Sequence, residues 1–380
     1  MTEKADYMIQ RRSLAAVAVA VLLVVAGCSG TSDQSPDATT TATTVGEINP
    51  TTTAQESDAS QMALPAGVTA NGLENASALV TAHNRSLADR SYRFAFESNS
   101  SEYSSRIRAA RGLDATLLVA NSANTTTRSW TQGSRTSMVQ TADGERGYRL
   151  VQGEYESALG FDTYADLTRA VLVTYLRVGE YETTDVVTRD GTKLVELTAT
   201  GINRSAVDQL AGEESNVSVD AFEARVLVDS DGVVHEFEAT VTETVDAESR
   251  TNEVGYDLSD LGSASVERPD WASSIPQLNA TITEDGAVAI EHTGGPAVED
   301  GTRLSMATDS VVDGAQLSKL SAGETAYLYV AETADGQRDV RASVGDRPSS
   351  DQVALNLSES DRLVISGTSR NVSILLQPEN

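Results

Sequence analysis

Between residues 92 and 152 the sequence repeats one short pattern, in which apolar and polar residues alternate and turn residues separate the repeats. In the first repeat, Tyr92, Phe94 and Phe96 alternate with charged or small residues. A period of two is typical of a strand with one buried face. Further strand-like segments follow at residues 105–111, 114–121, 125–131, 136–141 and 147–152. The chain is therefore expected to contain a long antiparallel run.

Two segments flanking this run have the helical period instead. In the first, apolar residues recur on one helical face. They are Leu73, Ala76, Val80, His83 and Leu87. Asn71 and Glu74 have the spacing of a capping box, which predicts that this helix begins after Asn71. A second helix is expected from Asp162, as its cap, to Gly179, where it ends.

Two hairpins and a short helix are predicted after the second helix. Asp190-Gly191 and Asp231-Gly232 supply the positive φ angles that tight hairpin turns require. The short helix lies between the hairpins, at residues 206–211. His83 and His235 each fall on an apolar face, so we interpret both as core residues rather than ligands.

The last hundred residues show almost no helical periodicity. Pro269 and Pro276 in the segment 268–276 indicate a domain boundary. Seven short strands are expected beyond it, at residues 287–292, 302–306, 325–332, 340–344, 353–357, 363–366 and 372–376. This number of short strands in about 100 residues predicts an all-β immunoglobulin-like sandwich over residues 273–380.

The N-terminus predicts export. Basic residues precede an uncharged apolar run from Leu14 to Gly27, which is too short to span a bilayer comfortably. Val25-Ala26-Gly27-Cys28 resembles the lipobox of secreted lipoproteins, which implies that residues 1–27 are a signal peptide and that Cys28 is the lipid attachment site. An ordinary signal peptide and a retained signal anchor are the alternatives. Arg11-Arg12 resembles a twin-arginine motif, so export by either the twin-arginine or the general secretory route stays open.

Residues 28–65 contain no basic residue and few large apolar groups. Such a segment buries too little surface to offset its ordering entropy. We expect a Thr/Ser-rich disordered tether between Cys28 and the folded body. The folded body would then lie at the extracytoplasmic face of the cell membrane.

The formal net charge is −28, with 56 acidic and 28 basic residues, and only three residues are lysine. At molar salt the Debye length is about 3 Å, so acidic side chains hardly repel one another. This composition resembles that of proteins from extreme halophiles. Nucleic acid is excluded as a partner, because phosphate binding needs a basic face.

Catalytic motifs are not found. Phosphate-binding glycine loops, Cys-x-x-Cys pairs and His-Glu-x-x-His helices do not occur in the sequence, and no serine lies in a Gly-x-Ser-x-Gly context. We therefore expect no catalytic residue, no metal site and no cofactor. Asn-x-Ser/Thr sequons are more prominent, and an exported protein would expose several of them to glycosylation. The candidate sites are Asn99, Asn124, Asn216, Asn279, Asn356 and Asn371.

The order of elements in residues 66–272 is a helix, a long antiparallel run, a second helix and two hairpins, followed by Arg268-Pro269-Asp270-Trp271. This order resembles uncharacterised haloarchaeal surface lipoproteins. More distantly, it is similar to the LolA/LppX group of lipoprotein and lipid carriers. The resemblance implies an α+β half-barrel, in which a curved antiparallel sheet wraps over helices and encloses an apolar cavity.

Two hypotheses for the function follow. In the first, the chain is a lipid-anchored, non-enzymatic binding protein that holds a lipid or another apolar ligand on the face of Tyr92, Phe94 and Phe96. In the second, it is a structural or adhesive protein of the cell envelope, and its partners are envelope proteins. An enzyme ranks third.

Overall fold

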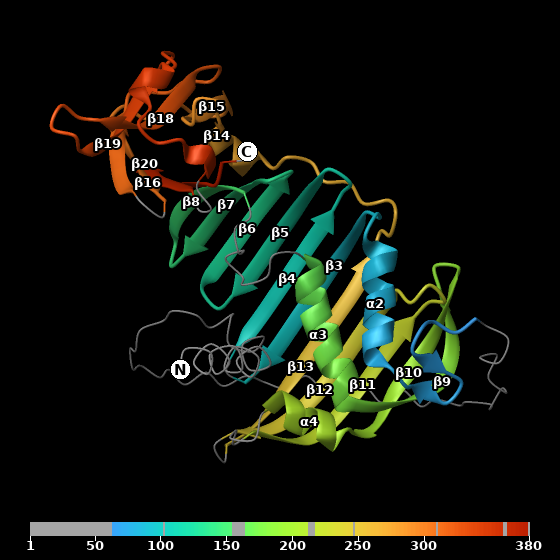
Figure 1. Cartoon of the computed structure of the whole chain (residues 1–380). Helices are drawn as coiled ribbons and strands as arrows, with labels where there is room; N and C mark the ends of the chain where they lie inside the picture. Colours follow the sequence, from blue (N-terminus) through green and yellow to red (C-terminus); the bar gives the residue numbers. More distant parts are fainter. Residues whose placement is uncertain are drawn as a thin grey trace. The chain divides into compact units, whose positions relative to one another are not determined.

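The computed structural model of the chain describes residues 63–101, 103–153, 164–211, 217–245, 248–308, 311–359 and 363–378 (Figure 1). These residues form two compact units. The first unit contains the described residues up to Ser86 and those from Thr168 to Asn252. The second contains the described residues of Leu87–Leu167 and Glu253–Asn380. Cys28 and the predicted tether up to residue 62 lie outside the described residues.

The first unit is built on an antiparallel sheet. Its strands are β9 (Gly179–Arg189), β10 (Thr192–Ile202), β11 (Val217–Val228), β12 (Val234–Val245) and the first residues of β13 (Glu248–Ser259). The strands are joined in the order β13-β12-β11-β10-β9. The predicted turn at Asp190-Gly191 is confirmed, since both residues have positive φ angles, of 51° and 80°. Because this two-residue turn matches the twist of its strands, it sets the β9–β10 register up to Asp185 opposite Glu196, beyond which the register shifts twice.

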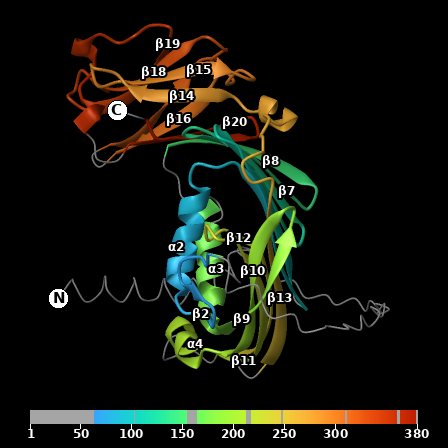
Figure 2. The same ribbon diagram turned by 90° about the vertical axis from the view of Figure 1, so that its right-hand side faces the viewer.

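Three helices accompany this sheet. They are α2 (Ala76–Leu87), α3 (Tyr164–Val178) and α4 (Arg204–Ala211). Both ribbon views show α2 and α3 side by side on one face of the sheet (Figures 1 and 2). The end of α3 before Gly179 and the short helix between the hairpins agree with the sequence predictions.

The predicted start of the first helix is wrong. Residues Val68–Thr69 (β1) and Gly72–Leu73 (β2) pair in a small hairpin, so Asn71 lies in a turn. The helix is capped by Asn75 instead, whose Oδ1 accepts a hydrogen bond of 2.9 Å from the Ala78 amide. A capping box predicts a helix start by spacing alone, and here a second Asn four residues later caps the helix instead.

The second unit begins with the predicted antiparallel run. It contains β3 (Tyr92–Ser100), β4 (Ser104–Arg111), β5 (Ala115–Ser122), β6 (Thr125–Gln132), β7 (Arg135–Ala142) and β8 (Glu145–Gln152). Each strand pairs with the next in antiparallel register. The strand segments predicted from the sequence coincide with these elements to within one or two residues.

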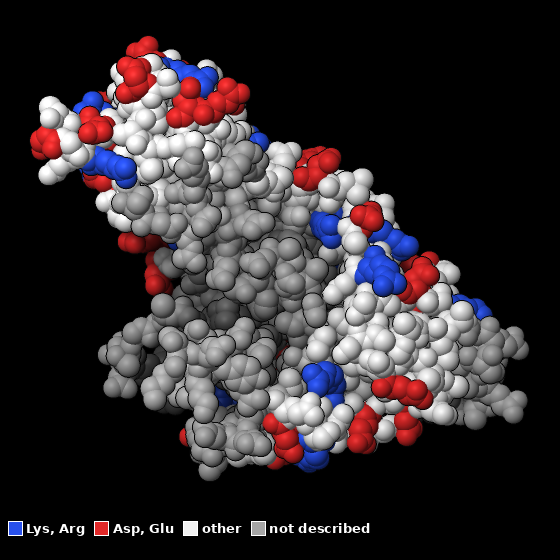
Figure 3. Space-filling model, in the orientation of Figure 1, with Lys and Arg blue, Asp and Glu red and all other residues white. Residues whose placement is uncertain are grey.

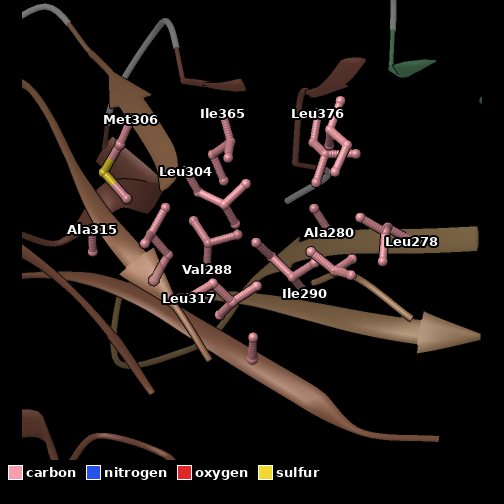
Figure 4. Close-up of a cluster of buried hydrophobic side chains, with 14 of the residues drawn as sticks. Leu278, Ala280, Val288, Ile290, Leu304, Met306, Ala315, Leu317, Ile365 and Leu376 are labelled. Atoms are coloured by element: carbon pink, nitrogen blue, oxygen red, sulfur yellow. The ribbon is translucent and has the colours of Figure 1, made fainter. Parts of the chain in front are cut away.

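The C-terminal segment contributes two sheets that share one core. The first has the order β14-β15-β18-β19, and the second the order β17-β16-β20-β21. Their bounds are β14 Gln277–Ile282, β15 Val288–Gly294, β16 Thr302–Ala307, β17 Val312–Leu317, β18 Thr325–Glu332, β19 Arg338–Val344, β20 Val364–Ser369 and β21 Val372–Leu376. Aliphatic side chains from both sheets meet between them, among them Ile290 and Met306 (Figure 4). The segment is therefore a β-sandwich, and its immunoglobulin-like character stays a prediction.

This sandwich is joined to the antiparallel run rather than separated from it. Strand β21 pairs in parallel with β8, from Val372 opposite Tyr148 to Leu376 opposite Gln152. The buried Gln152 side chain also accepts from the Ala280 amide and donates to its carbonyl, at 2.6 and 3.1 Å. The sequence placed a boundary at residues 272 and 273, whereas the structure groups the sandwich with β3–β8.

Some strand predictions fail for identifiable reasons. Residues 353–357 form no strand. The short 3₁₀ turns Ser350–Gln352 and Leu357–Glu359 lie there, and the Ala354 amide donates to the Val330 carbonyl at 2.7 Å. Strands β13, β14 and β17 were not predicted, because Asn252, Asn279 and Gly314 interrupt their apolar pattern.

The surface charge of the described residues is mixed. On the face shown in Figure 3, acidic and basic side chains lie next to one another.

Candidate functional site

The aromatic residues predicted to form a ligand face lie together on β3. Tyr92, Phe94 and Phe96 are 3%, 4% and 5% exposed, respectively. The residues between them are half-buried or exposed, so the alternation in the sequence corresponds to the two faces of the strand. The sequence prediction of a half-buried strand is therefore confirmed. Whether its apolar face holds a ligand is a separate question.

The register extends this face across four further strands. Directly paired residues of an antiparallel sheet project to the same side. Opposite Phe94, the row continues through Ala109, Leu118, Ser129 and Met138. Opposite Phe96, it continues through Ile107, Ala120 and Thr127. We call the side chains of these two rows, together with Tyr92, the graded face.

The graded face changes in size and polarity from one strand to the next. Large rings lie on β3, aliphatic or small side chains lie on β4 and β5, and the hydroxyls of Thr127 and Ser129 lie on β6. Leu118 is buried, whereas Ala120 and Ser129 are partly exposed. Because Ala109, Ala120 and Ser129 are small, they occupy little space next to the rings. The face thus has the chemistry to contact an apolar chain along β4 and β5.

Two contacts fix the aromatic end of this face. Phe94 packs against Tyr256 of β13, with ring centroids 6.1 Å apart, and burial raises the pKa of the Tyr256 hydroxyl well above its usual value. The guanidinium of Arg111 lies 5.8 Å from the centroid of the Tyr92 ring. Arg111 also donates to the Ala88 carbonyl at 2.7 Å. The rings are therefore held in place by neighbours within the second unit.

The three histidines each have an evident structural partner. In the first unit, the buried His83 accepts a hydrogen bond at Nδ1 from the Val234 amide, 3.0 Å away. His235 Nε2 lies 2.9 Å from Asp229 Oδ2. In the second unit, His292 Nε2 donates to the Pro296 carbonyl at 2.8 Å. The core placement predicted for His83 is confirmed, and His235 is mostly buried beside a carboxylate.

Asp229 organises the turn between β11 and β12. Its Oδ1 accepts hydrogen bonds of 2.9 Å from the Asp231 and Val233 amides. Burial opposes ionisation of this carboxyl, but the hydrogen bond to His235 and those from the backbone outweigh it and lower its pKa. The turn is thus a five-residue loop rather than the tight two-residue turn predicted at Asp231-Gly232. The carboxylate is engaged by the backbone amides of the loop and by His235.

The candidate glycosylation sites differ in exposure. Asn124, Asn356 and Asn371 are exposed, and Asn99 and Asn279 are half-buried. Asn279 Oδ1 also accepts from Gln152 at 3.0 Å, which leaves its amide nitrogen less accessible. Asn216, like Cys28, lies outside the described residues. Use of these sites stays a prediction.

Within the described ranges, no three His, Cys, Asp or Glu side chains are grouped so that they could share a metal ion. None of the described helices is both long and apolar enough to cross a membrane.

One further feature was not predicted from the sequence, a groove beside Trp130 and Arg268. Its only sequence signal is Trp130 on an otherwise polar strand.

Residues 13–274 match the family of unknown function DUF7537. No curated protein matches the chain. Among solved structures, the lipoprotein LppX of Mycobacterium tuberculosis is 15% identical, with 50% of this chain and 97% of that chain covered and a TM-score of 0.27. LprF from Mycobacterium bovis is 13% identical over 53% and 98% of the two chains, with a TM-score of 0.30. The Pseudomonas aeruginosa MucA/MucB complex is similar at 13% identity over 74% and 97%, with a TM-score of 0.27.

Proposed function

Since this chain belongs to DUF7537, a family of unknown function, we propose its role from its own residues: a non-enzymatic, extracytoplasmic binding protein. In this proposal the lipid on Cys28 tethers the protein to the membrane. The graded face of β3–β7 holds a lipid or another apolar ligand. The single observation that carries the proposal is the in-register step from Phe94 and Phe96 to the smaller side chains of β4–β6.

The shape of the graded face suits an apolar ligand. An apolar ligand gains about 25 cal/mol for each Å² of apolar surface removed from water. The rings of Phe94 and Phe96 offer such surface, and Ala109 and Ala120 take up little of the space next to it. Because the rings are buried in the chain as it stands, a ligand must enter beneath the groups that cover them. We therefore expect slow exchange and a ligand that remains bound through purification.

The first experiment is extraction of the purified protein. Full-length protein is isolated from its native host in molar salt, extracted with organic solvent, and the extract is analysed by mass spectrometry. The expected result is an apolar compound at a stoichiometry near one per chain. A clean extract from folded protein would contradict the proposal.

A matched pair of variants localises the ligand. Ala120→Phe adds a ring to the graded face, and Val119→Phe adds the same ring to the opposite face of β5. Ala120→Phe should reduce the bound compound at least severalfold, because it occupies the ligand's space. Val119→Phe should leave it unchanged. Equal retention by both variants would show that the compound binds elsewhere.

The alternative is a structural or adhesive role in the cell envelope. One observation favours it, namely the closed aliphatic core of the C-terminal sandwich, in which Ile290 and Met306 are at most 1% exposed. A β-sandwich of this kind is suited to spacing or protein contact. Cross-linking on intact cells that captured an envelope protein through residues 277–376, together with a clean extract, would favour this role.

A further inference from the structure

A groove with a volume of about 530 Å³ lies within the second unit. It is bounded by the turn between β4 and β5, by β6, and by the segment that leads into β14. Its principal lining residues are Leu113, Asp114, Trp130, Val266, Arg268 and Gln277. Small-molecule sites in proteins have volumes of roughly 300–1,000 Å³, so the groove is large enough for a small ligand.

One wall of the groove is apolar. Leu113 is 80% exposed, and it is one of two large apolar side chains that the described residues expose to this extent. Val266 and Ala115 are half-buried beside it. Exposed aliphatic side chains are common singly, but one that borders a groove offers a contact for an apolar chain.

The other wall carries hydrogen-bond donors. The guanidinium of Arg268 lies 5.5 Å from the centroid of the Trp130 ring and donates to the Ala272 carbonyl at 3.0 Å. Gln277, with its amide oxygen turned toward the guanidinium, accepts from both terminal nitrogens. These contacts leave the Nε hydrogen and one terminal hydrogen of Arg268 for a further acceptor.

Neither the Arg268 guanidinium nor the Trp130 indole N–H has a full set of acceptors among the described residues. Among the described residues, no carboxylate forms an ion pair with Arg268, although acidic residues are twice as numerous as basic ones. The Nε1 of Trp130 is buried and has no acceptor in the described part of the chain. Arg268, which is exposed, is therefore the donor of this wall that an acceptor in the groove can reach.

We propose that this groove binds an amphiphilic oxyanion, a carboxylate or phosphate that carries a short apolar chain. The anionic group is recognised by the free N–H groups of Arg268, which match the planar geometry of a carboxylate or the oxygens of a phosphate. The apolar chain lies along Leu113 and Val266. This site is distinct from the graded face, so either proposal can fail without the other.

The test is calorimetric titration of the full chain carrying Cys28→Ser, which removes the lipid attachment site, in molar potassium chloride. The probes are octanoate, octyl phosphate, 1-octanol and acetate. Binding of octanoate or octyl phosphate about tenfold tighter than octanol and acetate is expected, and it identifies both parts of the ligand. Equal affinity for octanol would overturn the proposal, as would an absence of binding by both anions.

Variants locate the site. Arg268→Gln should weaken octanoate binding about tenfold, the loss expected for one charged hydrogen-bonding group. Arg108→Gln removes an exposed arginine from β4 of the same unit and should have no effect. Asp114→Asn removes a negative charge from the rim and should tighten binding two- to threefold. Equal affinities of the Arg268 and Arg108 variants would overturn the assignment.

A position-specific measurement separates a local effect from misfolding. The chain has two tryptophans, Trp130 and Trp271, so its indole N–H groups give two resolvable NMR signals. Octanoate should shift the Trp130 signal strongly and leave that of Trp271 nearly unchanged. Shifts of equal size in both signals would contradict binding in the groove.

Discussion

The C-terminal sandwich and the graded face are both built from strands with alternating apolar residues, but they fill space differently. In the sandwich, alanine, leucine, isoleucine and methionine side chains from two sheets meet and close one core, and Leu278, Ile290 and Met306 are at most 1% exposed (Figure 4). On the graded face, rings stand beside alanines and hydroxyls. Alternation of apolar and polar residues therefore indicates a buried strand face but does not indicate what covers that face. In the sandwich a second sheet buries the apolar side chains, whereas on the graded face Ala120 and Ser129 remain partly exposed, and under the proposed function a ligand covers them.

The largest effect is expected from a matched pair of methionines. Met306→Ala, in the closed core, should lower the free energy of unfolding by about 2–5 kcal/mol, because it leaves a cavity that its neighbours cannot fill. Met138→Ala, on the partly exposed end of the graded face, should cost about 1 kcal/mol or less. Denaturant unfolding in molar salt measures both values. Equal losses would remove the distinction between the two regions.

The buried His83 in the core of the first unit provides a second test, through the pH dependence of the free energy of unfolding. Burial, followed by the nearby His235, lowers the pKa of His83 from 6.5 to about 4, while Asp229 opposes the shift. The unfolded chain therefore binds more protons than the folded chain between these pH values, and stability falls as the pH is lowered through this window. The loss should be about 3 kcal/mol, complete below pH 4.

The control for this prediction is His83→Gln. Glutamine can still accept the Val234 amide but does not titrate. The variant should retain most of the stability at neutral pH and lose much of the dependence between pH 4 and 6.5. Thermal unfolding at several pH values measures this dependence, and an unchanged slope would assign it to other groups.

Gln152 provides a test at a buried polar contact between β8 and β14. Its amide satisfies both the N–H and the carbonyl of Ala280 on the edge of β14. Gln152→Leu should therefore cost about 1–3 kcal/mol, because it leaves these backbone groups buried without partners. Gln140→Leu, at an exposed position on β7, is the control and should change stability by less than about 0.5 kcal/mol.

The sequence predicted most of the antiparallel run and the C-terminal end of α3, because Tyr92, Phe94 and Phe96 alternate with other residues and Gly179 follows the helix; the predicted cap Asp162 lies outside the described residues. It could not predict that β21 pairs with β8, since parallel pairing joins residues more than 200 positions apart without a local pattern. It also missed β14. The pattern of β14 is interrupted by Asn279, whose side chain is satisfied by Gln152 rather than by solvent alone.

For the candidate sites, the sequence identified the aromatic residues of β3 but not their neighbours across the sheet. The graded face depends on register, which local propensity leaves undetermined. The groove at Arg268 depends on a linker returning to Trp130, and both residues are unremarkable in the sequence. Contacts of this kind follow from tertiary packing and cannot be derived from periodicity.

The smallest effect is expected outside the core, where polar contacts meet solvent. On the outer surface of the first unit, Arg225 bridges Glu196, at 2.8 Å, and Glu236, while Arg189 also contacts Glu236 at 2.8 Å. Arg225→Gln should cost about 0.5 kcal/mol in dilute buffer, since exposed ion pairs contribute little. At molar salt the loss should shrink further, because the Debye length falls to about 3 Å. Unfolding at both salt concentrations measures the difference. A loss of the same size at molar salt would show that hydrogen bonds and packing, rather than charge attraction, stabilise this network. The network would then resemble the closed core of the sandwich more than a solvated surface.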